Sequence, residues 1–495
     1  MSPRSDCLEH PNRDGSAVER RARLAAIDAA LAGGTDSFAL RFERARTLDS
    51  LGFTDAAREA LLELLARDCG HAATLNELGR LLDRTSHHTA ARLAFARAVA
   101  LHPDDPAGHG NLGIALLDAG ETAAAAHHFE TAVQLDPGNV PAHQCLAILH
   151  LRNGDEPRAK ACGAIGFRSG ASVWPYRGDG QAIPLLVLHS ALGGNVSTEY
   201  YLDDRIFEKW TLVAEFADTT TPLPPHALVF NAIGDADRCH VALDAAAALL
   251  RRTTAPVVNR PQQVKATSRC ANGRRLAGLP GVVAPPVAVR SRDRLMAADA
   301  PADLAAAGFA FPLIVRAPGF HTGQHCVLVD DPRALRGVVA ELPGDELLVI
   351  AYVATRRADA LVRKYRVMIV GDALFPLHLA ISSHWKVHYF SADMAQRPEH
   401  RAEEERFLTD MPGVLGPRAV AALGAIRDRL GLEYGGIDFG LDERGDVVVF
   451  EANATMIVPP PPPEACWSYR RGPVERIHAA VKTLLVDLAL GAPVP

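Results

Sequence analysis

Apolar residues recur at helical spacing through the first third of the chain, and the whole pattern repeats with a fixed longer period. Aligning residues 72–105 with 106–139 superimposes the same side chains at a spacing of 34 residues: Leu78, Gly79, Ala91, Phe95, Ala98 and Pro103 recur as Leu112, Gly113, Ala125, Phe129, Ala132 and Pro137. The frame extends in degenerate form over 38–71 and 140–168, and residues 17–32 predict one further capping helix. The period predicts an all-α array of stacked helix pairs over residues 17–168.

The 34-residue pattern resembles the tetratricopeptide repeat (TPR). The resemblance implies two antiparallel helices per repeat, with a small residue where the helices cross closely and a proline after the second helix. Stacked pairs present a concave groove, so a protein or peptide partner is expected there. A rigid spacer or a dimerisation arm is the other use of such an array. The polar residues 1–16 are expected to be disordered.

The pattern changes class after a stretch rich in Gly, Pro and Ser, which predicts a linker over 169–183. Strand-like runs then alternate with one helical run, which predicts a parallel sheet in an α/β domain over 184–262. The predicted elements are strands at 184–189, 210–216, 227–231 and 255–259, a helix at 237–251 and a following helix at 261–278. Asn231 and Asp235 lie in a loop at a strand end, where open α/β sheets bind ligands; they are substrate-binding candidates or turn caps.

Near the C-terminus, two short apolar runs at 436–441 and 447–452 flank a polar turn and predict a hairpin. Alternation along the second strand puts Glu451 and Asn453 on one face, and Asp438 lies across from them if the register allows. Two carboxylates and an amide oxygen are ligands that suit Mg²⁺ bound together with phosphates. A solvated hairpin is the alternative, but Glu451 follows an apolar run that should be buried, and buried acids need partners.

The arrangement of Asp438, then Glu451-x-Asn453, resembles the last part of the ATP-grasp fold, the superfamily of glutathione synthetase, D-alanine:D-alanine ligase and biotin carboxylase. The resemblance implies that these three residues ligate Mg²⁺ with ATP. It also implies the domain organisation: an α/β pre-ATP-grasp domain over 184–262 that helps to hold a substrate, then an α+β ATP-grasp fold over 263–490. The predicted fold class is therefore multidomain, with an all-α TPR array followed by these two domains.

Other segments match the superfamily with departures. Two lysines that bind ATP in the superfamily are replaced by Arg269 and Arg316, which keep the charge and change the geometry. Between two predicted strands lies a glycine loop whose backbone N–H groups can close over phosphates. The loop residues assigned to ATP are Gly319, His321, Thr322, Gly323 and Gln324.

The resemblance further assigns Tyr352 and Val353, at the end of a predicted strand from 346 to 353, to the adenine. Lys364 and Arg366 alternate onto one face of the next strand; Lys364 is assigned to ATP and Arg366 to the phosphoryl group in transfer. The return strand is dense in imidazole and aromatic rings, which form either a substrate wall or ordinary sheet packing. These residues are His378, His384, Trp385, His388 and Tyr389.

Composition narrows the compartment and the partners. Lys and Arg number 52 against 58 Asp and Glu, a net charge of −6, so neither nucleic acid nor an acidic membrane is an expected partner. The eight cysteines show no zinc-ligand spacing, and no run of 18 apolar residues occurs. A cytoplasmic protein without a membrane-spanning segment is expected.

These inferences together predict an ADP-forming carboxylate–amine ligase that uses ATP and Mg²⁺. A carboxylate is phosphorylated to an acyl phosphate, and an amine then displaces phosphate to give an amide or peptide bond. The expected substrates are a carboxylate and an amine, as small molecules or peptides. The alternative is a TPR scaffold or interaction protein whose ATP-grasp domain binds nucleotide but is catalytically inactive.

Overall fold

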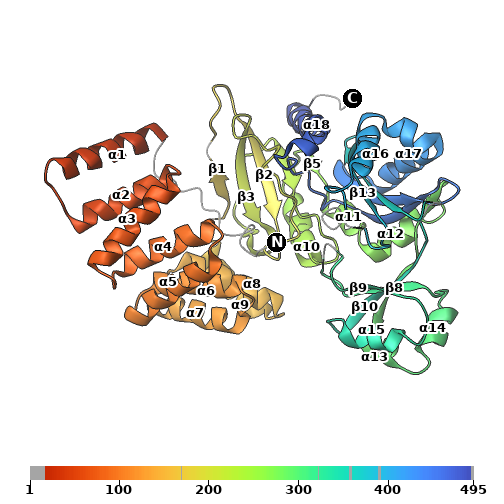
Figure 1. The fold of residues 1–495 in the computed structure, drawn as a ribbon, viewed down its shortest axis with the longest axis horizontal. Helices are drawn as coiled ribbons and strands as arrows, with labels where there is room; N and C mark the ends of the chain where they lie inside the picture. The colour runs from red at the N-terminus through yellow and green to blue at the C-terminus, as the bar shows by residue number, and fades with distance from the viewer. Residues whose placement is uncertain are drawn as a thin grey trace. The chain divides into compact units, whose positions relative to one another are not determined.

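The computed structural model describes residues 17–168, 170–174, 176–320, 323–355, 359–387 and 392–491. The chain divides into two compact units (Figure 1). The first ends at Ser172 and also takes in Phe216–Asp218, and the second comprises Val173–Glu215 and the chain from Thr219 onward. Each unit has its own buried apolar clusters.

The first unit is a helical array in which successive helices pair as antiparallel neighbours. A small residue lets each pair cross closely: a Cβ on Gly79 would lie 2.4 Å from Cε1 of Phe95, and one on Gly113 would lie 2.7 Å from Cε1 of Phe129. The same glycine–phenylalanine contact therefore recurs every 34 residues. The predicted helical array is confirmed. Its described helices are α1 (Ala17–Ala32), α2 (Phe38–Ser50), α3 (Thr54–Arg67), α4 (Ala72–Arg84), α5 (His88–Leu101), α6 (Pro106–Asp118), α7 (Thr122–Leu135), α8 (Val140–Arg152) and α9 (Glu156–Gly166).

The second unit mixes helices and sheets and begins with a parallel sheet. Its strand order is β1-β3-β2-β4-β5, with parallel pairing among β2, β3, β4 and β5. The strand expected at 210–216 lies three residues earlier, because Ala214–Phe216 close a 3-10 turn instead of extending the strand. The elements of this part are β1 (Ser172–Trp174), β2 (Ile183–His189), β3 (Phe207–Val213), β4 (Leu228–Asn231), α10 (His240–Leu250) and β5 (Val257–Val258).

Two further sheets follow. One has the order β7-β10-β8-β9 and is antiparallel throughout, and its apolar face packs on short helices. Its elements are β7 (Val287–Ser291), α13 (Arg292–Met296), α14 (Ala300–Ala306), β8 (Leu313–Arg316), β9 (Cys326–Val329), α15 (Leu335–Glu341) and β10 (Glu346–Ala351).

The last sheet carries most of the predicted site and has the order β12-β11-β13-β14-β6, antiparallel except for the β14–β6 pair. Its elements are β6 (Val282–Val283), β11 (Val362–Val370), β12 (Ala373–Ser382), α16 (Pro398–Thr409), α17 (Met411–Leu430), β13 (Tyr434–Leu441), β14 (Val447–Asn453) and α18 (Arg471–Leu490). The apolar face of α18, with Ile477 and Val481, shares one core with Phe230 of the parallel sheet and Met368 of β11.

The helix expected over 261–278 is two helices, α11 (Pro261–Lys265) and α12 (Arg269–Leu276). Ser268 begins the second one, because its hydroxyl accepts a hydrogen bond from the Ala271 N–H at 3.3 Å. The break places Arg269 in the first turn of α12, so its backbone N–H is not used within the helix.

A side chain links the parallel sheet to the last sheet. Asn259, just after β5, has a φ of 60°, a left-handed conformation that Asn tolerates better than most residues. Its Nδ2 donates to the Tyr434 carbonyl at 2.8 Å, and its Oδ1 accepts from the Tyr434 N–H at 3.0 Å. The amide thus occupies the place of a neighbouring strand at the start of β13.

Candidate functional site

Asp438 lies at the centre of the candidate site, fully buried on β13. The antiparallel register puts it beside Arg366 of β11. Arg366 donates from Nε to Oδ1 at 2.5 Å and from Nη2 to Oδ2 at 2.8 Å, and Lys364 Nζ lies 2.5 Å from Oδ2. Lys364 and Arg366 therefore face the same way, as alternation along the strand predicted.

Burial alone would raise the pKa of Asp438, because it disfavours the charged form. The positive charges of Arg366 and Lys364 outweigh burial and hold that pKa well below its usual range. The neighbouring His378, on β12 opposite Arg366, is buried, and burial with the adjacent Arg366 charge lowers its pKa well below the ordinary value. His378 is accordingly a neutral imidazole behind the Arg366–Asp438 pair.

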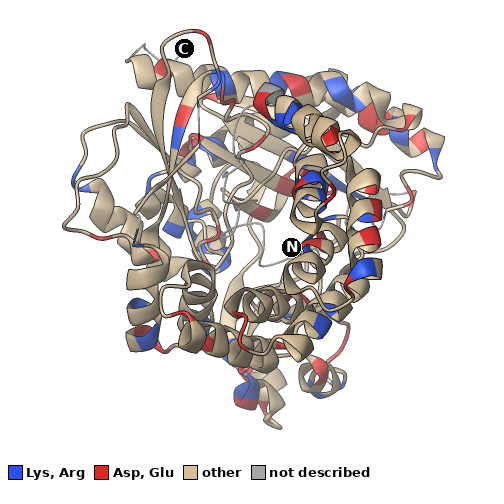
Figure 2. Ribbon diagram, turned by 90° about the vertical axis from the view of Figure 1, so that its left-hand side faces the viewer, with Lys and Arg blue, Asp and Glu red and all other residues tan. Residues whose placement is uncertain are grey.

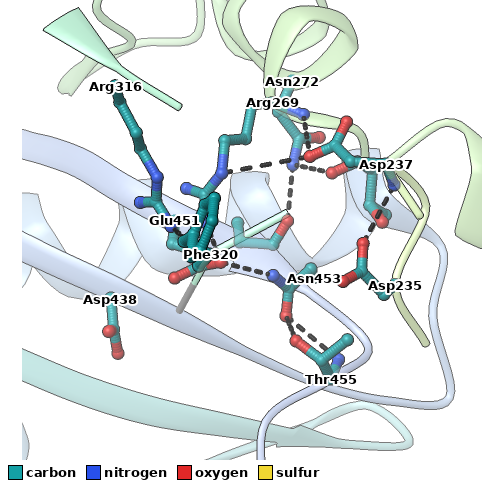
Figure 3. Close-up of polar contacts among 12 residues, drawn as sticks. Asp235, Asp237, Arg269, Asn272, Arg316, Phe320, Asp438, Glu451, Asn453 and Thr455 are labelled. Carbon is teal, nitrogen blue, oxygen red and sulfur yellow. Dashed lines mark hydrogen bonds and ion pairs between the residues drawn. The ribbon is translucent and has the colours of Figure 1, made fainter. Parts of the chain in front are cut away.

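Glu451, on β14, lies directly opposite Asp438 of the adjacent β13. The register shifts just beyond this pair, so that Phe450 is an extra residue on β14 and is 39% exposed. This bulge interrupts the simple alternation of side chains along β14 between Val449 and Glu451. Glu451 Oε1 accepts from Arg269 Nη2 at 2.7 Å and from Asn453 Nδ2 at 2.9 Å (Figure 3).

Charges also set the ionisation of Glu451. Burial would raise its pKa, but Arg269, with weaker contributions from Lys364 and Arg316, brings the pKa below its ordinary value. For Arg269, burial favours the neutral form, whereas the carboxylates of Glu451 and Asp237 more than compensate and raise its pKa. Both members of the Arg269–Glu451 pair are therefore charged at neutral pH.

Asn453 follows Glu451 on the strand, and its two amide atoms have different partners. Its Nδ2 donates to Glu451, while its Oδ1 accepts from the Thr455 N–H at 3.0 Å and from the Thr455 hydroxyl at 2.8 Å. The oxygen that was expected to bind a metal is thus satisfied by Thr455. Among the described residues, no three His, Cys, Asp or Glu side chains gather as a metal-binding group.

Arg316 ends β8 above this cluster (Figure 3). Its Nη2 donates to the Phe320 carbonyl, and its buried Nε has no hydrogen-bond partner among the described residues. Burial lowers its pKa, and the nearby Arg269 charge adds to that effect. A buried guanidinium with an unused donor is a place where an anion would be stabilised.

The glycine loop beyond Arg316 contains two glycines in the left-handed region, with φ of 78° at Gly319 and 74° at Gly323. Lys386 Nζ donates to the Gly323 carbonyl at 3.3 Å. Gly323 and Gln324 are among the residues that line a cavity of about 290 Å³. The predicted loop residues His321 and Thr322 lie outside the described residues, as do His388 and Tyr389 of the return strand.

The two residues expected near adenine follow β10. Tyr352 is half-buried and meets Trp385 edge to face, with ring centroids 6.3 Å apart. Val353 is also half-buried. Trp385, which follows β12, thus makes an aromatic contact with Tyr352 of the neighbouring segment.

Sequence reasoning missed Asp237 and Asn272. Asp237 Oδ2 accepts from the Arg269 backbone N–H at 3.4 Å, and Asn272 Nδ2 donates to the Thr267 carbonyl at 3.0 Å and to the carbonyl of Ala452. Ser268 ahead of Arg269 was the available signal, since a serine N-cap predicts a new helix whose first N–H groups need acceptors.

The whole arrangement gathers buried charges of both signs. Four cations, Lys364, Arg366, Arg269 and Arg316, lie around Asp438 and Glu451, and Asp235 and Asp237 add two more carboxylates near Arg269. Arg316, whose buried Nε has no hydrogen-bond partner among the described residues, is the cation that an anionic ligand would stabilise. Most charged groups are already oriented by ion pairs, so the site is preorganised before any ligand binds.

Comparison with known proteins identifies the first unit. Two tetratricopeptide-repeat families match the chain, one over residues 42–106 and the other over 116–162. The N-terminal helices are therefore tetratricopeptide repeats. Such repeats commonly bind peptides or proteins in their concave groove.

Solved structures similar to the chain cover the same region. They include MamA 41-end from Desulfovibrio magneticus RS-1 (18% identity, 31% of this chain and 95% of that one, TM-score 0.25) and pilF of Pseudomonas aeruginosa (20%, 31% and 78%, 0.27). YrrB, described as a TPR protein with an unusual peptide-binding site, is 18% identical over 30% of this chain and 78% of that one, with a TM-score of 0.25. No curated protein matches the chain. Among the described residues, no helix is long and apolar enough to cross a membrane.

Proposed function

We propose that the second unit is an ADP-forming carboxylate–amine ligase of the ATP-grasp type, using ATP and Mg²⁺. The observation that carries the proposal is the cluster of four cations around the buried Asp438–Glu451 pair, in which Nε of Arg316 has no hydrogen-bond partner among the described residues. Polyphosphate bound with a divalent cation matches that pattern, because it presents negative oxygens to the arginines and a positive ion to the carboxylates.

The roles of individual residues follow from their positions. Asp438 and Glu451 would hold the metal with Asn453, provided that the Asn453 oxygen is released from Thr455. ATP would be bound by Arg316, Arg269, Lys364 and the loop at Gly319 and Gly323. When bound, ATP would supply the phosphoryl group that activates the carboxylate.

Arg366 is assigned to the phosphoryl group in transfer. It donates two hydrogen bonds to Asp438, so its orientation is fixed before any ligand arrives. A fixed guanidinium stabilises charge that spreads over the equatorial phosphoryl oxygens. Tyr352 and Trp385, which meet edge to face, and Val353, which follows Tyr352, are assigned to the purine ring.

The test has a binding arm and a turnover arm. Calorimetry with ATP and Mg²⁺ is expected to show binding, and ADP release is expected only in mixtures that contain both carboxylic acids and amines. Glu451→Gln is expected to abolish the turnover, whereas Glu443→Gln, an exposed change in the turn of the same hairpin, should leave it unchanged. Normal turnover in a well-folded Glu451→Gln protein would remove the metal assignment.

A second candidate function is a TPR interaction protein whose second unit binds nucleotide without chemistry. The engagement of the Asn453 oxygen by Thr455 favours this candidate, because it withdraws one expected metal ligand. Nucleotide binding with no ADP release in any acid and amine mixture would select it. Asn453→Asp, which restores an oxygen donor, is a useful companion variant.

For the repeat unit we infer a peptide or protein partner in the groove of the helix pairs. Support comes from the general use of these repeats and from the peptide-binding site named for YrrB. Fluorescence polarisation with a panel of labelled decapeptides tests the inference. Micromolar, saturable binding of a sequence subset supports it, and no binding across the panel removes it.

A further inference from the structure

Arg269 contacts two carboxylates that belong to distant parts of the second unit. Its Nη2 donates to Glu451 Oε1 on β14 at 2.7 Å, and its Nε lies 3.9 Å from Asp237 Oδ2, in the loop between β4 and α10. The same Asp237 oxygen accepts from the Arg269 backbone N–H at 3.4 Å. Figure 3 shows the guanidinium between these two carboxylates, and its side chain is 17% exposed.

The Asp237 loop is fixed on the end of β14. Asp235 Oδ1 accepts from the backbone N–H groups of Asp237 and Arg238 at 3.0 and 3.1 Å, which sets the turn. A Cβ on Gly234 would come within 2.9 Å of the backbone of Ala454, so only glycine allows this approach. Asp237 is therefore held beside the strand end that carries Glu451.

Helix α12 is fixed to the same strand from the other side. Asn272, 7% exposed and one turn beyond Arg269, donates to the backbone carbonyl of Ala452, between Glu451 and Asn453. With the helix anchored, the remaining freedom of Arg269 lies in its long side chain. Asp237 forms an ion pair with that side chain near Nε, at 3.9 Å, while Glu451 accepts a hydrogen bond from its end.

Arginine is suited to this double contact. A guanidinium carries N–H groups on Nε and on its terminal nitrogens in one plane, so one side chain can face two carboxylates, here with a hydrogen bond to Glu451 and an ion pair with Asp237. A lysine has only a terminal ammonium on a flexible stem, and it cannot meet Asp237 and Glu451 in the same way. Arg269 stands where a lysine was expected, and Asp237 lies where it can pair with the guanidinium that only arginine has.

We propose that Asp237 is a positioning residue that acts through Arg269. It holds the guanidinium in the orientation that binds the phosphates of the nucleotide. The inference rests on the proposed function, since it concerns the same ATP site. Asp237 itself touches no phosphate. Its contribution depends on arginine at position 269 and should vanish when that residue is lysine.

Two simpler roles of Asp237 predict different changes in ATP affinity when it is replaced. If Asp237 were only a nearby negative charge, Asp237→Asn would strengthen ATP binding, because a repulsion is removed. If Asp237 only accepted the first N–H of α12, its replacement would lower the melting temperature and leave ATP affinity unchanged. The positioning role predicts weaker ATP binding.

The experiment is a double-mutant cycle on the full chain, read by calorimetry of ATP with Mg²⁺ at 0.15 M salt and by thermal unfolding. The proteins are the native chain, Asp237→Asn, Arg269→Lys and the double variant. Asp237→Glu tests rescue by the conserved charge. Asp244→Asn is the matched control, since Asp244 is an exposed acid on α10 that pairs only with Lys265 among the described residues.

The expected result is a loss of about tenfold in ATP affinity for Asp237→Asn, partial recovery for Asp237→Glu, and no effect of Asp237→Asn in the Arg269→Lys background. Asp244→Asn should bind ATP as the native chain does. Unchanged or tighter binding by Asp237→Asn, or an equal loss in both backgrounds, overturns the inference and leaves the proposed function standing. If the native chain binds no ATP, the proposed function fails, and the inference fails with it.

Discussion

In the repeat unit a residue has the same neighbours as the residue 34 positions further on, whereas in the second unit the residues that meet are separated by irregular intervals. Gly79 packs on Phe95 just as Gly113 packs on Phe129. Across the site, by contrast, Arg269 and Glu451 are 182 residues apart. A repeat can be recognised from local pattern alone, and a site assembled over long separations needs the strand register.

The comparison also concerns energy. The repeat unit is stabilised by close apolar contacts of one kind, such as an aromatic ring packed against a glycine. The same contact recurs in successive repeats. The site relies on buried charges that are tolerable only together, because each carboxylate compensates specific cations. A single substitution should therefore lower the stability of the first unit moderately, and a substitution at the centre of the site should lower the stability of the second unit strongly.

The largest expected effect is at Asp438. Asp438→Asn leaves Lys364 and Arg366 without their buried partner, so we expect a loss of ~3–5 kcal/mol in the free energy of unfolding. Urea unfolding of the full chain, followed by circular dichroism, measures it. Asp446→Asn, which removes only an exposed pair with Arg418, should change little; equal effects of the two variants would contradict the comparison.

The same aspartate gives a pH dependence with a definite sign. Its pKa in the folded protein lies well below its value in the unfolded chain, so its stabilisation is fully present above the unfolded pKa of about 3.9 and is lost as the pH falls through the folded pKa. The stability difference between the native chain and Asp438→Asn should be constant above about pH 5 and shrink below pH 4. Unfolding curves across this range decide the point; a difference that shrinks on raising the pH would contradict it.

A smaller effect is expected at Arg316, whose charge has no carboxylate partner among the described residues. Arg316→Met should weaken ATP binding by roughly tenfold to a hundredfold, about 1.5–3 kcal/mol, because one charge-assisted contact is lost. Arg316→Lys should recover part of that affinity. Arg336→Met, on the exposed side of α15, is the control; calorimetry that finds Arg316→Met unchanged would favour the scaffold function.

The smallest effects concern the repeats. Gly79→Ala forces a methyl group against the Phe95 ring and should cost ~1–3 kcal/mol, whereas Gly110→Ala, in open space on α6, should gain up to ~1 kcal/mol from helix propensity. Thermal unfolding of the repeat transition measures both. Restoration of stability in Gly79→Ala by Phe95→Leu would place the cost in that contact, and equal shifts for the two glycines would refute it.

Much of this structure could be predicted from the sequence where one period governs. The 34-residue spacing predicted α4 to α7, and alternation predicted that Lys364 and Arg366 face the same way. The hairpin pattern also predicted that Asp438 could lie opposite Glu451, because adjacent antiparallel strands leave few registers.

The remainder depended on features that no local period encodes. The bulge at Phe450 changes which side chains share a face with Glu451, and a bulge is one extra residue that the apolar pattern does not mark. The orientation of the Asn453 amide is decided by Thr455, and the contact between Asp237 and Arg269 by the packing of two distant segments. Such contacts depend on register and docking, which a single sequence does not display.

The Asn259 amide that pairs with both backbone groups of Tyr434 has a mechanical consequence. The amide holds the first residue of β13 by two hydrogen bonds. Asn231 Nδ2 fixes Asn259 in turn by donating to its backbone carbonyl at 2.8 Å. Shear between the parallel sheet and the strand of Asp438 would have to break these bonds together. The Tyr434 amide hydrogen should therefore be among the slowest in the chain to exchange with solvent, and Asn259→Ala should make that one proton exchange faster.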